Sequence, residues 1–142
     1  MAANISMAAN ISPPSTGNPE RHRIVPHVDV AEQGDVRIVS FQRDEKGVVS
    51  FDVVRNYFAT MMLEHTHGWP RVVLDLGGVP ALDSAALGPL VQKLREVQEA
   101  RGKLVLTGVD APALREIFAL TRFDRVFPIL ANQELAVAAA AS

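Results

Sequence analysis

VVLDLGGVPALDSAALGPL, residues 72–90, is the stretch that decides the fold of this chain. Its first part, together with Arg71, is a nearly all-apolar run that ends at Gly77-Gly78. A short apolar run bounded by turn residues is typical of a strand that is buried on both faces of a sheet. Apolar residues at helical spacing follow, at Leu87, Leu90, Val91, Leu94 and Val97. The stretch therefore predicts a central strand and then an amphipathic helix that ends at Arg101-Gly102, a basic last turn followed by glycine.

Strand and helix patterns alternate along the rest of the chain. Two β-rich runs, which start at His27 and Val36, surround Gly34-Asp35 and predict a hairpin. The further elements that we predict are a helix over 51–65, a strand from Lys103, a helix from Pro112, a short edge strand over 126–130 and an alanine-rich helix after Asn132. This order predicts an α/β domain with a mixed, mostly parallel β-sheet, an N-terminal β-hairpin and about four flanking α-helices.

Polar residues mark the starts of the predicted helices. Ser50, Asp110 and Asn132 each precede such a segment and are expected to act as N-caps. In the first helix, helical spacing places Phe51, Val54, Phe58 and Met61 on one apolar face.

The first 22 residues differ in character from the rest of the chain. They hold a tandem repeat, MAANIS-MAANIS, followed by SPPSTGNPE, which is rich in Pro, Ser, Gly and Asn. The repeated unit is far too short for a solenoid, and nothing here predicts a packed element. We therefore expect residues 1–22 to form a disordered tail and residues 23–142 to form the single domain.

Composition narrows the class of protein. Apolar residues make up 48% and charged residues 21% of 142 residues, which is ordinary for a soluble globular domain with one core. The formal net charge of −2 gives no electrostatic case for a nucleic-acid partner. The chain has no cysteine, no apolar run of the roughly 20 residues that a membrane helix needs, and no pattern of a secretory signal. We therefore expect a cytoplasmic protein without membrane insertion.

Asp83 and Ser84 stand between the predicted central strand and the predicted helix. Ligands and reactive groups of open α/β sheets gather beyond the carboxyl ends of the strands, which is where this pair is expected. Either residue can cap the helix, but a cap needs only one of them. Pro89 lacks an N–H and clashes deep in a helix, so we expect the regular helix to begin around Ala86. The Ser84 hydroxyl would then point outward at the positive end of the helix.

The pattern LDL-x-x-V-x-x-L-D-S-x-x-L, read as a strand, a turn and an amphipathic helix, resembles STAS domains, and specifically bacterial anti-sigma factor antagonists. The resemblance covers roughly residues 27–140, and its later landmarks are GKLVLTGV, the helix-starting Asp-Ala-Pro and LTRFDRVFPIL. It implies a STAS fold for the domain. The chain departs from the pattern at Ala85 and Ala86, where many members of the family have Ser or Thr and then Gly.

For function, the resemblance implies a phosphorylation switch. In such antagonists an anti-sigma factor that is also a serine kinase phosphorylates the serine after the aspartate. The unphosphorylated antagonist binds this kinase and frees a sigma factor, and a serine phosphatase restores binding after phosphorylation. Ser84 is then the phosphoacceptor, and the expected partner-binding residues are Asp83, Ser84, Ala85, Ala86, Leu87 and Gly88. The resemblance also allows a STAS binding module without phosphorylation, in a signalling scaffold or a membrane transport complex.

Other kinds of site find less support in the residues. Asp75 resembles the phosphoaccepting aspartate of a response-regulator receiver, but the acidic pair and the strand-final lysine of a receiver have no counterpart. We therefore interpret Asp75 as a strand-end residue held by backbone donors. No hydrolase motif supplies a base to Ser84, so we expect no enzyme. His65 and His67 have no third ligand nearby and no nucleotide loop is present, so we expect no metal and no cofactor.

Overall fold

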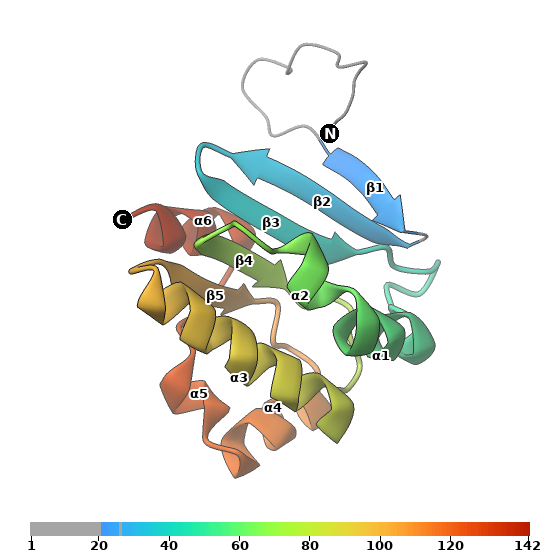
Figure 1. Ribbon diagram of the computed structural model, residues 1–142. Helices are drawn as coiled ribbons and strands as arrows, with labels where there is room; N and C mark the ends of the chain where they lie inside the picture. The colour runs from blue at the N-terminus through green and yellow to red at the C-terminus, as the bar shows by residue number, and fades with distance from the viewer. Residues whose placement is uncertain (1–20, 26) are drawn as a thin grey trace.

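A six-stranded mixed sheet forms the centre of the computed structural model, which describes residues 21–25 and 27–142 (Figure 1). The strands are β1 (Arg21–Val25), β2 (Val28–Gln33), β3 (Val36–Phe41), β4 (Arg71–Asp75), β5 (Lys103–Thr107) and β6 (Ile129–Leu130). The helices are α1 (Phe51–Thr60), α2 (Met62–His65), α3 (Ser84–Glu99), α4 (Pro112–Leu120), α5 (Phe123–Val126) and α6 (Gln133–Ala141). Helices separate the strands from β3 onward, which confirms the predicted α/β class.

The strands lie in the sheet in the order of the sequence. β1, β2 and β3 pair antiparallel, and β2 and β3 form the hairpin predicted around Gly34-Asp35. The pairs β3–β4, β4–β5 and β5–β6 are parallel, and helices cross between them. The carboxyl ends of β3, β4 and β5 therefore lie along one edge of the sheet, where α1, α3 and α4 begin.

Hydrophobic layers cover both faces of the sheet. Val72 and Leu74 of β4 belong to the larger layer, which α1, α2, α3 and α4 complete with residues such as Leu90. Val73 belongs to the other layer, which includes Ala136 of α6. Figure 1 shows α1 and α3 in front of the sheet and α6 behind it. The three central residues of β4, Val72, Val73 and Leu74, are fully buried, so the prediction of a central strand buried on both faces is confirmed.

The domain begins earlier than predicted. Arg21 and His22, which we assigned to the disordered tail, belong to β1, and Arg21 pairs with Ala31 of β2. The short run RHRIV carries little strand signal of its own, and its conformation depends on the neighbouring strand. Residues 1–20, the remainder of the predicted tail, lie outside the described residues.

Two of the three predicted N-caps are confirmed. Ser50 Oγ accepts a hydrogen bond from the Val53 N–H at 3.4 Å, and Asn132 Oδ1 accepts one from the Leu135 N–H at 2.8 Å. The prediction for Asp110 is wrong, because the N-cap position of α4 is Ala111, which makes no side-chain cap. Pro112 occupies the first position of α4, so the helix start relies on the fixed φ of proline instead.

The helices are also more divided than predicted. The single helix expected over 51–65 is interrupted at Met61, whose φ of −127° separates α1 from α2. The predicted edge strand over 126–130 shortens to two residues, because α5 includes Val126. The described chain thus has four helices of nine residues or more, as predicted, and two four-residue helices that were missed.

Cations from two strands hold the end of α6. Arg71, the first residue of β4, donates from Nη1 to the carbonyl oxygens of Ala140 at 2.5 Å and Ser142 at 3.1 Å. Lys103, the first residue of β5, donates to the carbonyl of Ala139 at 3.3 Å and to Ser142 Oγ at 2.9 Å. Cations favour the negative end of a helix, so these bonds fix α6 against the sheet.

Candidate functional site

The loop after β4 places Asp83 and Ser84. The Leu76 N–H donates to the Thr107 carbonyl of β5 at 2.8 Å, and the Val79 N–H turns back to the Leu76 carbonyl at 3.0 Å. Leu76, Val79 and Leu82 are buried in the core. Three buried side chains therefore fix the position of the loop. As a result, Asp83 lies at the edge of the sheet where the parallel strands end.

A contact between two loops brings the starts of α1 and α3 to the same edge. The Val49 N–H donates to the Gly78 carbonyl at 2.8 Å, which ties the segment before α1 to the loop before α3. Gly78 has a φ of 84°, and a Cβ atom there would lie 2.8 Å from the Gly47 carbonyl oxygen. The close approach of the two loops therefore requires glycine at this position. Figure 1 shows both helices starting on the same side of the molecule.

Asp83 is the N-cap of α3. Its Oδ1 accepts a hydrogen bond from the Ala85 N–H at 3.1 Å, and its carbonyl accepts one from the Ala86 N–H at 3.1 Å. Ser84 is the first residue of the helix and is exposed. Because Asp83 caps the helix, the Ser84 hydroxyl at the positive end of the helix is not needed as a cap.

The predicted start of α3 around Ala86 is wrong, since the helix begins at Ser84 and contains Pro89. Proline at this position removes the hydrogen bond to the Ala85 carbonyl, four residues earlier. Ala85 is exposed, so water can satisfy that carbonyl and the helix tolerates the proline.

The structure separates the six predicted partner-binding residues by burial. Ser84, Ala85 and Gly88 are exposed, and Asp83 and Leu87 are half-buried. Ala86 is only 1% exposed and belongs to the core, so its side chain is not offered to a partner. A Cβ atom on Gly88 would meet nothing within 4 Å, which shows that the surface around it is open.

Sequence reasoning missed two apolar residues on the same edge. Val48 lies three residues before the first residue of α1 and is 42% exposed, and Phe51, which is that first residue, is 38% exposed. Helical spacing assigned Phe51 to the buried face with Val54, which is 1% exposed. As the first residue of α1, however, Phe51 lies at the margin of the sheet, where the core no longer covers it. Val48 and Phe51 therefore leave exposed apolar area at the start of α1.

Asp75, the aspartate that resembles a receiver phosphoacceptor, has both carboxylate oxygens engaged. Oδ1 accepts a hydrogen bond from the Gly77 N–H at 2.9 Å, as the prediction of backbone donors required. Oδ2 accepts a hydrogen bond from the side-chain amide of Gln133 in α6 at 2.9 Å. No local sequence pattern predicts this second bond. Asp75 therefore serves to join the end of β4 to its loop and to α6.

A second polar cluster lies near α2, away from Ser84. The rings of Tyr57 and His65 lie 5.9 Å apart, and within the described chain the Tyr57 hydroxyl and His65 Nδ1 are buried without a hydrogen-bond partner. Burial raises the pKa of Tyr57 far above its usual range and lowers the pKa of His65. The Arg37 guanidinium lies 5.2 Å from the centre of the Trp69 ring. The structure thus does not bring His65 to the serine.

Two kinds of feature are absent from residues 21–25 and 27–142. No group of three or more His, Cys, Asp or Glu side chains there is arranged to hold a metal ion. In the same residues, no helix combines the length and the apolar character that crossing a bilayer demands.

Comparison with known proteins defines the family. The family model of the STAS domain matches residues 27–136, so the chain belongs to the STAS domain family. A Bordetella bronchiseptica protein, BtrV, which is named as an anti-sigma factor antagonist, is 32% identical over 94 residues, or 66% of this chain and 80% of BtrV. The recognition of the family from the LDS pattern is thereby confirmed.

Solved structures confirm the fold. An anti-sigma factor antagonist (STAS) domain protein from Planctomyces limnophilus is 26% identical, with a TM-score of 0.67 over 81% of this chain and 98% of that chain. A sulfate transporter family protein from Wolinella succinogenes shares the fold at 18% identity, with a TM-score of 0.57 over 77% of this chain and 87% of that chain. The predicted STAS fold is therefore correct.

Proposed function

We propose that this protein is an anti-sigma factor antagonist that is switched by phosphorylation of Ser84. In its unphosphorylated form it binds an anti-sigma factor that is also a serine kinase, and a sigma factor is released. The kinase phosphorylates Ser84 and dissociates, and a serine phosphatase regenerates the binding form. In this cycle the protein is a regulatory partner in the cytoplasm and a substrate, and it performs no catalysis of its own.

The observation that carries the proposal is the exposure of Ser84 next to an aspartate that already caps the helix. Asp83 Oδ1 takes the Ala85 N–H at 3.1 Å, so the serine hydroxyl is not needed for folding. Ser84 is exposed at the first position of a 16-residue helix. A kinase can therefore reach this hydroxyl without unfolding the chain. The family membership and the similarity to BtrV support the same assignment.

The surroundings of Ser84 suit a protein partner. Ala85 and Gly88 are small and exposed on α3, so a partner surface can approach the helix backbone closely. Val48 and Phe51 supply exposed apolar area beside the start of α1. Protein interfaces combine buried apolar area with hydrogen-bonding groups, and this surface offers both.

Phosphorylation of Ser84 should weaken the interface with the kinase and leave the fold intact. A phosphoserine carries a charge of about −1.5 to −2, which the positive end of α3 tolerates in the free protein. In the complex the same group would be desolvated beside the Asp83 carboxylate, and repulsion and desolvation both oppose binding. Modification therefore weakens the complex without unfolding the antagonist.

The test is phosphorylation by the cognate anti-sigma kinase with ATP, followed by mass spectrometry to locate the phosphate. We expect a single phosphate on Ser84, none in Ser84→Ala, and loss of kinase binding by the phosphorylated protein. Ser84→Glu should bind the kinase more weakly than wild type. Phosphate on another residue, or release of Ser84→Ala by ATP as fast as wild type, would refute the proposal.

Ser50 provides a matched control, because it is also an exposed serine at the start of a helix. Its hydroxyl caps α1, so Ser50→Ala should lower stability slightly but should still be phosphorylated on Ser84. Affinity purification addresses the alternative function. Recovery of membrane transport subunits in place of a kinase would favour an unphosphorylated binding module.

A further inference from the structure

A hollow of about 370 Å³ lies beside the first half of β5, and residues of α3, α5 and the end of α6 also line it. Its walls are mostly apolar and include Leu94 and Val97 of α3, Leu104 of β5, Val126 of α5 and Pro128. The volume falls in the range of small-molecule sites. None of the residues 83–88 lines it, so the hollow is separate from the surface around Ser84.

The edge of β5 is open in this hollow. β6 has two residues and pairs only with Leu106 and Thr107, and the Leu106 N–H donates to the Pro128 carbonyl at 2.9 Å. Every second residue of a strand turns its N–H and C=O to the same side, so those of Leu104 also face away from β4. Leu104 is 1% exposed and lines the hollow. Its N–H is therefore a buried donor on the wall of the hollow, ready for an acceptor.

Lys103 gives the hollow its charge. Its Nζ is held by the Ala139 carbonyl at 3.3 Å and Ser142 Oγ at 2.9 Å, which are neutral oxygens. Among the described residues that line the hollow, Lys103 is the only one with a charged side chain. The Ser142 backbone oxygen is bonded to Arg71 at 3.1 Å. Lys103 thus places an ammonium group beside apolar walls, and such a group favours an anionic group on a ligand.

We propose that the hollow binds an aliphatic carboxylate of medium chain length. The carboxylate accepts hydrogen bonds from Lys103 Nζ and the Leu104 N–H, and the alkyl chain packs along Leu94 and Val97 under Val126. Val126 is apolar but 50% exposed, and a bound alkyl chain would cover part of it. The apolar walls and the cation together select an amphiphilic monoanion over a neutral lipid. The ligand is thus the free acid and not an ester or thioester, which has no anionic group.

The probe is sodium decanoate, titrated below its micelle concentration into the ¹⁵N-labelled full chain. We expect saturable shifts of the Lys103, Leu104 and Val126 amide resonances. Methyl decanoate and 1-decanol keep the alkyl chain without the anion, so they should bind at least about tenfold more weakly. Equal affinity for these neutral probes, shifts centred on other residues, or no saturable shift would overturn the proposal.

Paired variants separate a specific site from general binding to exposed apolar residues. Val126→Glu places a carboxylate at the hollow and should weaken decanoate binding at least about tenfold. Leu135→Glu changes a residue of α6 that is 47% exposed but does not line the hollow, so decanoate affinity should be unchanged. Amide spectra that match wild type away from the substitution show that each variant is folded. Decanoate binding of Val126→Glu at wild-type affinity would contradict the proposed site.

Discussion

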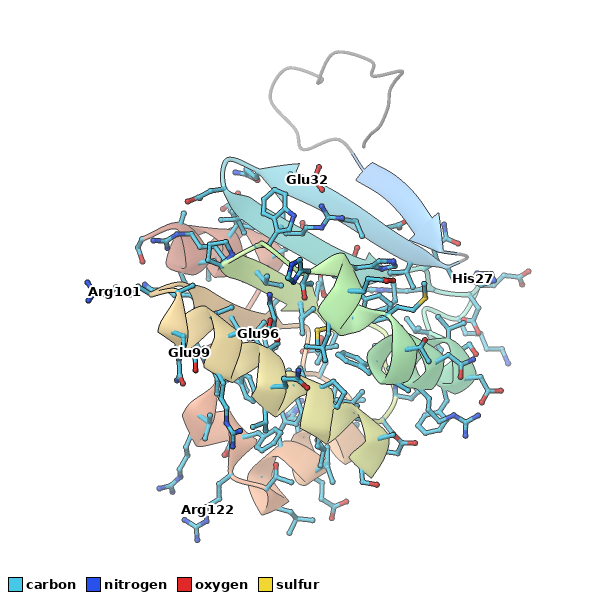
Figure 2. The ribbon with its side chains drawn as sticks, in the orientation of Figure 1. His27, Glu32, Glu96, Glu99, Arg101 and Arg122 are labelled. Atoms are coloured by element: carbon cyan, nitrogen blue, oxygen red, sulfur yellow. The ribbon has the colours of Figure 1, made fainter. Side chains whose placement is uncertain are left out.

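The ammonium group of Lys93, in the middle of α3, donates a hydrogen bond to the backbone carbonyl of Thr66 at 2.7 Å. Lys93 is 2% exposed, and the carboxylate of Glu96, which Figure 2 labels on α3, lies 3.6 Å from the same nitrogen. Burial lowers the pKa of Lys93, and the Glu96 carboxylate opposes that shift. The Thr66 carbonyl also accepts the Trp69 N–H at 3.0 Å. A buried cation thus fastens α3 to the segment after α2.

Replacement of this lysine tests how much the bond stabilises the fold. Lys93→Met keeps the length of the side chain, removes a desolvated charge and leaves the Thr66 carbonyl with its bond from Trp69. We therefore expect a change of less than about 1 kcal/mol in the free energy of unfolding. Lys93→Glu buries an unpaired carboxylate next to a carbonyl and Glu96, and should cost about 3 kcal/mol or more. Urea unfolding of both variants measures the difference, and equal destabilisation would contradict this account.

His65 should make stability depend on pH. Desolvation lowers its pKa in the folded state, Glu64 opposes the shift and Arg37 adds to it. The unfolded chain, with a histidine pKa of about 6.5, therefore binds the proton more readily than the folded protein. Stability due to neutral His65 is fully present above about pH 6.5 and is lost as the pH falls toward the folded pKa.

The measurement compares the free energy of unfolding at pH 7.5 and pH 5.5. His65→Gln should lose less stability than wild type between these two values. The control is His67→Gln, because His67 is exposed in the same segment and should leave the pH dependence as in wild type. An unchanged slope in His65→Gln would show that the histidine does not act in this way.

A substitution at Gly88 should raise the stability of the fold and weaken the binding of the kinase. It lies inside α3 in open space, so the fold has no steric need for glycine there. Gly88→Ala should raise the free energy of unfolding by about 0.5–1 kcal/mol, because alanine loses less backbone entropy in a helix. Under the proposed function it should also weaken binding to the kinase, since a methyl group enters the interface. Thermal unfolding and calorimetric titration check the two effects, and Gln92→Ala, also exposed on α3, is the control.

Asp83 should stabilise the fold in two ways, through the hydrogen bond that its side-chain oxygen accepts and through its negative charge at the start of α3. Asp83→Ala removes the cap and the favourable charge at the helix start, and should cost about 1–2 kcal/mol of unfolding free energy. Asp83→Asn keeps an acceptor for the Ala85 N–H and loses only the interaction of charge with the helix dipole, about 0.3–1 kcal/mol. Chemical denaturation ranks the variants. An Asn variant as unstable as the Ala variant would show that the cap bond contributes nothing.

The elements predicted correctly are those whose pattern is local. β4 and the apolar face of α3 could be read from a few neighbouring residues, because burial on a strand or helix repeats with the period of that element. The caps Ser50 and Asn132 likewise act within three residues. The LDS pattern placed Asp83 and Ser84 at the right edge of the sheet for the same reason.

The remaining features depend on contacts between distant segments. β1 forms because β2 offers it an edge, and Gln133 meets Asp75 across 58 residues of sequence. The start of α3 was predicted too late because Pro89 was expected to prevent a helix before Ala86. The helix accommodates this proline because the Ala85 carbonyl, which loses its hydrogen bond, belongs to an exposed residue. Burial of Ala86 and exposure of Phe51 depend on where the sheet ends, which periodicity alone does not reveal.

The bonds of Arg71 and Lys103 to the end of α6 bear on how the protein should be produced. Ser142 is bonded through its backbone oxygen and its hydroxyl, and it also lines the hollow beside β5. An affinity tag or fluorescent protein fused after Ser142 would disturb the hydrogen bonds of Ser142 to Arg71 and Lys103. It would also lie next to the hollow, which Ser142 lines. β1 lies at the opposite edge of the sheet from β6, so the N-terminal side of the domain is the better place for a fusion.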